Sequence, residues 1–307
     1  MVAIEQMSVL FIIMLVGYIA FKKDILTESI NKRISGIVLY IANPAMILSS
    51  VMGDNSKIKG ESLVIMVLVT IIAYALLIGI SFIIPRMFMM SKGSLNTYSI
   101  MVVFSNISFM GMPIVRSFVG DNGLLYAAIY VIPFNVLIYT YGVAMLRKDV
   151  TKDKEGGSLI KSILNIGTIA SVIAILIFVI GIPIPYVIKE SCGMLGNLTA
   201  PLSMMIIGAS FATINLKNMV TDIKLLLFCL FKQFIIPIVG IWLIRLFVTN
   251  DIIVNVMFVM LATPVASMVA MLTQEYDGDF ELATRGVALS TIISVISIPI
   301  ISALMNI

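Results

Sequence analysis

The stretch SNISFMGMPIV, Ser105 to Val115, places an asparagine, two serines, a glycine and a proline inside an otherwise apolar segment. Pro113 lacks an N–H, and its ring clashes with the carbonyl four residues earlier, so a helix must bend or break there. Gly111 allows backbone angles outside the helical range. The stretch therefore predicts an interrupted helix.

The composition around this stretch is that of an integral membrane protein. Of the 307 residues, 60% are hydrophobic and 12% are charged, whereas soluble domains are about 25% charged; the mean hydropathy is +1.12. Ten apolar runs are each close to the about 20 residues that a helix needs to cross a bilayer. The runs are residues 3–21, 34–51, 62–90, 97–116, 123–146, 162–182, 192–213, 223–247, 252–273 and 283–304. We therefore predict an all-α integral membrane protein with ten transmembrane helices.

Lysine and arginine are distributed unequally between the loops. Fourteen lie in the odd-numbered loops, counted from the start of the chain, and five in the even-numbered loops. The positive-inside rule places the odd-numbered loops in the cytoplasm. We therefore predict a cell-membrane protein with both termini outside and a cytoplasmic central loop. Because the basic residues lie between apolar runs, the net charge of +4 does not indicate nucleic-acid binding.

Prolines recur at matched positions in the two halves of the chain. Pro44 and Pro201 are 157 residues apart, Pro85 and Pro237 are 152 apart, and Pro113 and Pro264 are 151 apart. Five helices per half is an odd number, so the second half must enter the membrane from the opposite side. Such inverted repeats are the plan of many secondary transporters. We predict a first five-helix repeat over residues 1–147, a linker over 148–161 and a second repeat over 162–307.

The ninth apolar run has its own interruption. In LATPVASM, Thr263, Pro264 and Ser267 correspond in position to the stretch in the fourth run. Non-helical backbone at membrane depth is tolerated only inside protein or beside a water-filled cavity. We predict that the interrupted fourth and ninth helices cross there, each second half-helix presenting its positive N-terminal end to the crossing. Such ends bind anions. The alternative is a plain proline kink satisfied by neighbouring helices.

Several motifs resemble the auxin efflux carrier family, which includes plant auxin exporters and bacterial permeases for malate- and malonate-like acids. NISFMGMP, with Asn106, Gly111 and Pro113, is similar to that family's Asn-x4-Gly-x-Pro pattern. ATPVASMVAMLTQEY, APLSMMIIGASFA and STIISVISIPI resemble its ninth, seventh and tenth helices. The resemblance covers essentially the whole chain. It implies a scaffold part, a mobile transport part that moves as an elevator, and a substrate site at the crossing. The long central loop of the plant exporters is missing, which favours a bacterial-type member and leaves auxin open as the substrate.

Uncharged polar residues at mid-depth are the candidate substrate ligands. Asn106 is the first candidate, because an amide donates to a carboxylate without adding charge. Asn43 and Asn135 follow, and Ser105 and Thr263 supply hydroxyls beside the two interruptions. Each asparagine has the alternative role of an interhelical hydrogen bond, worth about 0.6 kcal/mol. We expect Ser290, Thr291 and Ser294 to bond to the preceding helical turn.

Lys232 is a charged residue in the middle of the eighth run. It lies ten residues from Asp222, hence about 15 Å along the helix. A charge at that depth costs at least about 2.5 kcal/mol. We expect Lys232 to act as a counter-charge, which either contacts an anionic substrate or steadies the crossing. The alternative is a bond to carbonyls freed by Pro237 or by the interrupted helices.

The sequence lacks the residues that other classes of function need. The chain has no histidine, which excludes Ser–His pairs and HExxH metal sites, and we predict no catalytic residues, no metal and no cofactor. We predict a secondary transporter that exports small organic anions, such as mono- or dicarboxylates or auxin-like weak acids. The alternatives are a sodium-coupled organic-anion transporter of the bile-acid type and a channel or membrane scaffold. The expected partners are the anion, the lipid bilayer and a second copy of the chain in a homodimer.

Overall fold

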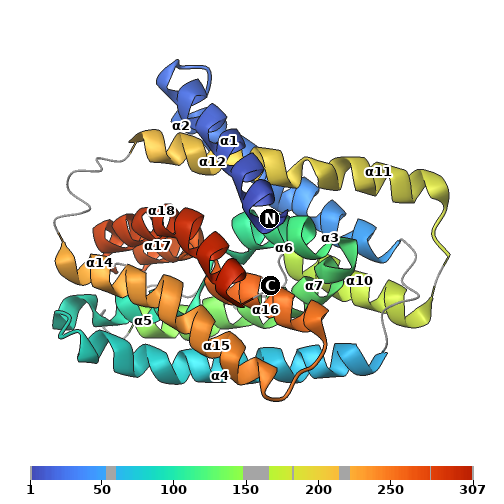
Figure 1. Ribbon diagram of the computed structural model, residues 1–307. Helices are drawn as coiled ribbons and strands as arrows, with labels where there is room; N and C mark the ends of the chain where they lie inside the picture. Colours follow the sequence, from blue (N-terminus) through green and yellow to red (C-terminus); the bar gives the residue numbers. More distant parts are fainter. Residues whose placement is uncertain are drawn as a thin grey trace.

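The computed structural model describes residues 2–52, 60–147, 166–181, 183–213, 222–276 and 278–305, and these residues form a bundle of helices (Figure 1). No strand occurs in these ranges; extended pairing is limited to one isolated antiparallel bridge between Ser105 and Val265. In Figure 1, helices α11 and α12 run along the top, α4 runs along the bottom, and α7 and α16 lie between them. The prediction of an all-α membrane protein is confirmed.

The first half contains α-helices joined by short π- and 3-10 turns, which are labelled η. Its elements are α1 (Val2–Lys22), α2 (Glu28–Ile37), η1 (Val38–Ala42), α3 (Asn43–Val51), α4 (Gly60–Met87), η2 (Lys92–Ser94), α5 (Leu95–Val103), η3 (Ile107–Gly111), α6 (Met112–Val119), α7 (Asp121–Leu137), η4 (Ile138–Gly142) and α8 (Val143–Arg147). The helix over the second apolar run starts at residue 28, earlier than predicted, because Thr27 caps it by accepting a hydrogen bond from the N–H of Ile30.

The second half has the same mixture of long and interrupted helices. Its elements are α10 (Ile166–Ile180), α11 (Tyr186–Asn197), α12 (Thr199–Thr213), α14 (Ile223–Leu230), η5 (Phe231–Ile235), α15 (Ile236–Arg245), α16 (Asp251–Ala262), α17 (Ser267–Glu275) and α18 (Phe280–Met305). The predicted linker over 148–161 lies outside the described residues. The seventh run also begins earlier than predicted, at Tyr186.

Helical segments occupy each of the ten apolar runs. Within the described ranges, five helical stretches are long and apolar enough to cross a membrane, namely Gly60–Met87, Asp121–Leu146, Tyr186–Ala212, Ile223–Arg245 and Phe280–Met305. Shorter apolar helices cover Ser8–Lys22, Ile107–Val119 and Asp251–Ala262. The last two are short because the fourth and ninth runs are interrupted.

Three of the π-turns stand directly before an X-Pro pair. They are η1 before Asn43-Pro44, η3 before Met112-Pro113 and η5 before Ile236-Pro237. In each case the residue before the proline donates its N–H to the carbonyl five residues earlier, as Met112 does to Ile107. The wider turn relieves the clash between the proline ring and the preceding turn. The prediction was that the fourth helix bends or breaks at Pro113; the structure has a π-turn directly before this proline, and the chain continues from it as α6.

The first and seventh apolar runs make a very close helix–helix contact. A Cβ atom on Gly208 of α12 would lie 1.8 Å from the carbonyl oxygen of Met14 in α1, and one on Gly17 would lie 2.2 Å from that of Met205. Glycines allow this approach because they have no side chain, as in other membrane helix pairs. The pair α1–α12 is thereby fixed at backbone-to-backbone distance.

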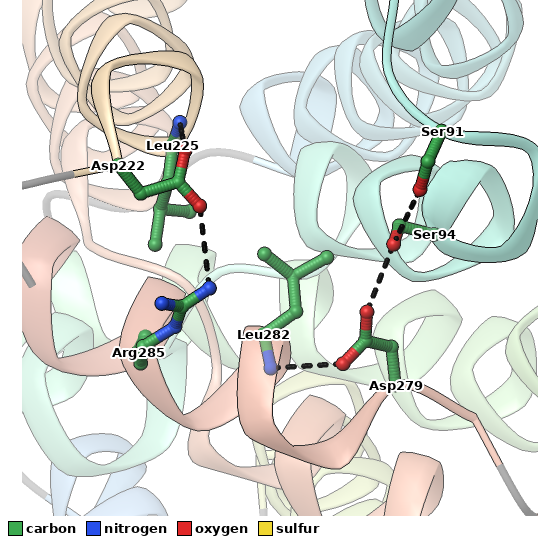
Figure 2. A network of polar contacts seen from close by, with 7 residues as sticks. All are labelled: Ser91, Ser94, Asp222, Leu225, Asp279, Leu282 and Arg285. Carbon is green, nitrogen blue, oxygen red and sulfur yellow. Dashed lines mark hydrogen bonds and ion pairs between the residues drawn. The ribbon is translucent and has the colours of Figure 1, made fainter.

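A polar network joins the ends of α14, α18 and the α4–α5 connection (Figure 2). Asp222 caps α14 by accepting from the N–H of Leu225 at 3.1 Å, and it pairs with Arg285 of α18 at 3.2 Å. Asp279 accepts from the N–H of Leu282 at 3.1 Å and from the hydroxyl of Ser94 at 2.8 Å. These contacts tie first-half and second-half helices together at one end of the bundle.

We expect Asp222→Asn and Asp222→Ala to separate the two roles of this carboxylate. Asparagine keeps the cap and loses only the ion pair, whose partners are 28% and 30% exposed, so the loss is less than about 1 kcal/mol. Alanine also removes the cap, for about 1 kcal/mol more. Thermal unfolding of purified protein measures the difference. Equal melting temperatures for the two variants would contradict the capping role.

Candidate functional site

The two interrupted helices meet through their backbones. The N–H of Asn106 donates to the carbonyl of Pro264 at 2.7 Å, and the N–H of Ala266 donates to that of Phe104 at 3.0 Å. These two bonds form the antiparallel bridge between Ser105 and Val265. Buried N–H and C=O groups need partners, and each interruption supplies them to the other. The fourth and ninth runs therefore contact each other at the points where they leave the helical conformation.

The interruption of the fourth run lies upstream of the proline. Phe104 is extended (φ −101°, ψ 111°), and Asn106 (φ −77°, ψ 63°) starts the next turn by accepting a hydrogen bond from the N–H of Phe109 at 3.4 Å. Gly111 has helical angles (φ −62°, ψ −52°), so its predicted departure from the helix is wrong. Its lack of a side chain instead suits close packing, because a Cβ there would lie 3.5 Å from Thr263 Cγ2.

In the ninth run the proline lies within the interruption itself. Helix α16 ends at Ala262, Thr263 (φ −65°, ψ 147°) and Ala266 (φ −65°, ψ 133°) are extended, and α17 begins at Ser267. Pro264 fits an extended position because it needs no N–H partner. The Thr263 hydroxyl donates to the carbonyl of Met260 at 3.0 Å, so this side chain satisfies the preceding helix turn.

A cavity of about 140 Å³ lies beside the crossing. Its polar side chains are three asparagines and three serines, namely Asn43, Asn106, Asn135, Ser105, Ser108 and Ser267. Its other walls are mainly apolar and include Phe109 and Phe134, and Tyr40 adds a phenol ring. Residues 107–109 and 266–268 also line it, so the first turns of both second half-helices border the cavity. Helix N-termini carry free N–H groups and a partial positive charge.

Comparison with known proteins places this chain in a transporter family. The family described as "Membrane transport protein", which is the auxin efflux carrier family, matches residues 2–302. The chain belongs to the auxin efflux carrier family. The resemblance inferred from the motifs is thereby confirmed, and the members compared are transporters.

Two archaeal relatives match the chain over almost its full length. An uncharacterized transporter of Methanocaldococcus jannaschii is 25% identical over 310 residues, which cover 97% of each chain. An uncharacterized transporter of Methanothermobacter thermautotrophicus is 22% identical over 303 residues, which cover 98% of each chain. The similarity is thus to whole transporters.

The structure brings together four of the predicted ligands in this auxin efflux carrier family member. Asn43, Asn106, Asn135 and Ser105 all line the cavity, and they are 5%, 5%, 7% and 6% exposed. The Oδ1 atom of Asn43 is buried and has no hydrogen-bond partner within the described residues. Thr263 and Lys232 do not line the cavity. Lys232 is connected to the cavity through Ser105, which lines it and is hydrogen-bonded to the ammonium.

Lys232 is bonded to the first interruption. Its side chain is 1% exposed, and its ammonium donates to the carbonyl of Val102 at 3.0 Å and to Ser105 Oγ at 3.1 Å. Val102 lies in the last turn of α5, where the helix carries partial negative charge. The placement agrees with the alternative that Lys232 bonds to carbonyls freed by an interrupted helix. Because an ammonium only donates, Ser105 Oγ accepts from it and keeps its own O–H free to donate.

A second polar link, not predicted from the sequence, starts from η5, the π-turn that contains Lys232. The Gln233 amide donates to the carbonyl of Ser290 at 3.1 Å, and Ser290 Oγ accepts from the N–H of Val265 at 3.0 Å. Ser290, Thr291 and Ser294 do bond to the preceding turn, as predicted, but Ser290 also holds the second interruption. Consecutive residues of η5 thus support both interruptions, Lys232 the first and Gln233 the second. The sequence signal for this link is the polar pair Lys232-Gln233 within the apolar eighth run.

Proposed function

We propose that this auxin efflux carrier family member is a secondary transporter that exports small organic anions by alternating access at the crossing. Mono- and dicarboxylates and auxin-like weak acids form the proposed substrate class. The observation that carries the proposal is the cavity bordered by the first turns of two half-helices, η3–α6 and α17. Two positive helix ends at one small cavity favour an anion.

The polar groups around the cavity support a negatively charged substrate. Among the described residues, those that line the cavity include no aspartate or glutamate that would repel an anion. Asparagine amides and serine hydroxyls offer hydrogen bonds to carboxylate oxygens. The Ser105 hydroxyl lies between the cavity and the Lys232 ammonium. This arrangement extends the influence of a buried positive charge toward the substrate without placing the charge in the cavity.

The size of the cavity favours a small acid. Its volume of about 140 Å³ is below the about 300–1,000 Å³ of pockets for drug-sized ligands. The apolar walls suit a short hydrocarbon skeleton between or beside carboxylates. On this ground we favour mono- and dicarboxylates over substrates as large as a bile acid.

Matching helix pairs support the inverted repeat on which alternating access depends. Helix α1 packs against α12 and α10 packs against α3, which pairs the first run with the seventh and the sixth with the second. The third and fourth runs pack together through α4 and α5, as the eighth and ninth do through α15 and α16. The fourth and fifth runs pack together through α6 and α7, as the ninth and tenth do through α17 and α18. We propose two inverted five-helix repeats in a cell membrane, with both termini outside and an elevator-type movement of the crossing.

Anion binding and counterflow test the proposal. Malonate, malate, acetate and indole-3-acetate are compared with neutral malonamide in thermal unfolding of purified protein at constant ionic strength. We expect at least one acid to raise the melting temperature saturably, since a ligand at about 100 times its Kd stabilises by about 2.7 kcal/mol, and malonamide to have no effect. In proteoliposomes, preloaded acid should accelerate uptake of the labelled acid, which a channel does not do. Equal stabilisation by malonamide would refute an anion-selective site, and flux indifferent to preloading would refute alternating access in favour of a channel.

A further inference from the structure

The Lys232 ammonium is held by two oxygen acceptors at the crossing. It is fully buried, and no carboxylate in the described part of the chain forms an ion pair with it. Its two acceptors are a backbone carbonyl, that of Val102, and a hydroxyl, that of Ser105. Both are neutral oxygens, and backbone carbonyls also replace the hydration shell of K⁺ in channel filters.

The Val102 carbonyl is available because α5 is interrupted. In a continuous helix it would accept from the N–H of Asn106, four residues later. That N–H donates to Pro264 instead, at 2.7 Å. The freed carbonyl belongs to the negative end of the half-helix. In transporters with interrupted helices, unwound carbonyls and half-helix C-terminal ends coordinate the coupling Na⁺ or H⁺.

We propose that Lys232 is a tethered cation that takes the place of a dissociable coupling ion at the crossing. The ammonium neutralises the end of α5, holds Ser105 in position and remains bound throughout the transport cycle. A cation carried by the chain cannot be exchanged between the two sides of the membrane. The crossing therefore assembles without sodium, and no sodium gradient drives the transporter through this site.

This proposal is independent of the substrate. It concerns the cation that stabilises the interrupted helix, and its test needs no transported molecule. A protein that moves no organic anion at all would still show the cation behaviour described next. Failure of the proposed function and failure of this inference are therefore distinguishable.

The test removes the tethered cation and asks whether a free cation replaces it. Wild type, Lys232→Ala and Lys232→Met are purified, and their thermal unfolding is followed in sodium, potassium, ammonium, methylammonium or N-methyl-D-glucamine chloride at equal ionic strength. We expect the wild type to melt at the same temperature in all five salts. Lys232→Ala leaves space beside Val102 and Ser105, so a small cation should raise its melting temperature saturably by several degrees over N-methyl-D-glucamine.

Matched variants make the result specific. Methionine fills the space, so Lys232→Met should melt independently of the cation. Lys224→Ala removes an exposed lysine of α14 that donates to the carbonyl of Met89, and it should behave as the wild type does. If Lys232→Ala does not accumulate, Lys232→Ser serves as the second variant, because serine leaves similar space and adds an oxygen ligand. Saturable stabilisation of the wild type by sodium or potassium would overturn the proposal, as would small-residue variants that are indifferent to every cation.

Discussion

Lys232→Met is expected to abolish anion transport while leaving a protein that inserts and folds. The ammonium donates to Val102 and Ser105, and without it the Ser105 hydroxyl is free to turn toward the Val102 carbonyl and away from the cavity. A hydrogen bond to a charged group is worth about 1.5–3 kcal/mol, and each 1.4 kcal/mol is about tenfold in affinity. Because the positive charge is also lost, we expect uptake at low substrate concentration to decrease about 100-fold or more.

Stability should change little in this variant, because two effects oppose each other. Methionine removes the donor to Val102 and Ser105, and each buried acceptor that then stays unpaired costs about 1–3 kcal/mol. It also removes a buried charge that costs at least about 2.5 kcal/mol. Expression and melting temperature therefore separate a transport defect from a folding defect. Lys232→Arg, which keeps the charge with a different shape, should be intermediate, and Lys224→Met should transport normally. Normal transport by Lys232→Met would remove the electrostatic support for an anionic substrate.

Asn106→Ala is expected to fold and to bind the anion about 10- to 100-fold more weakly. Asn106 lines the cavity, and its Oδ1 accepts from the N–H of Phe109 at 3.4 Å, so its amide NH₂ remains as a donor to a carboxylate. Losing a hydrogen bond to a charged group costs about 1.5–3 kcal/mol. Loss of the helix cap adds about 1 kcal/mol of destabilisation. Concentration-dependent thermal shift and uptake by proteoliposomes measure the two effects.

Asn250→Ala is the matched control for Asn106→Ala. Asn250 also caps a helix, since its Oδ1 accepts from the N–H groups of Ile252 and Ile253, but it does not line the cavity. Both alanine variants lose a cap, and only Asn106→Ala should lose anion affinity. Equal anion affinity in the two variants would show that Asn106 acts only as a cap.

Local chemistry in the sequence determined much of the fold. Apolar runs of bilayer length predicted where the helices lie, because a chain in hydrocarbon must satisfy its own backbone. Polar residues in apolar runs identified Asn43, Asn106 and Asn135, and the structure places all three at one cavity. Family-specific motifs sufficed to recognise the auxin efflux carrier family.

The tertiary structure alone decided where the fourth helix is interrupted and what holds it there. The sequence placed the interruption at Gly111 and Pro113, because these residue types disrupt helices. In the structure a π-turn directly before Pro113 accommodates the proline, and Gly111 keeps helical angles. The interruption falls at residues 104–106 instead, because residues more than 150 positions away pair with that backbone. The partner of Lys232 was likewise undetermined by the sequence. A lysine in an apolar run indicates from the sequence alone that burying its charge costs free energy. The oxygens that offset this cost belong to a distant part of the chain, and only tertiary packing brings them within hydrogen-bond distance.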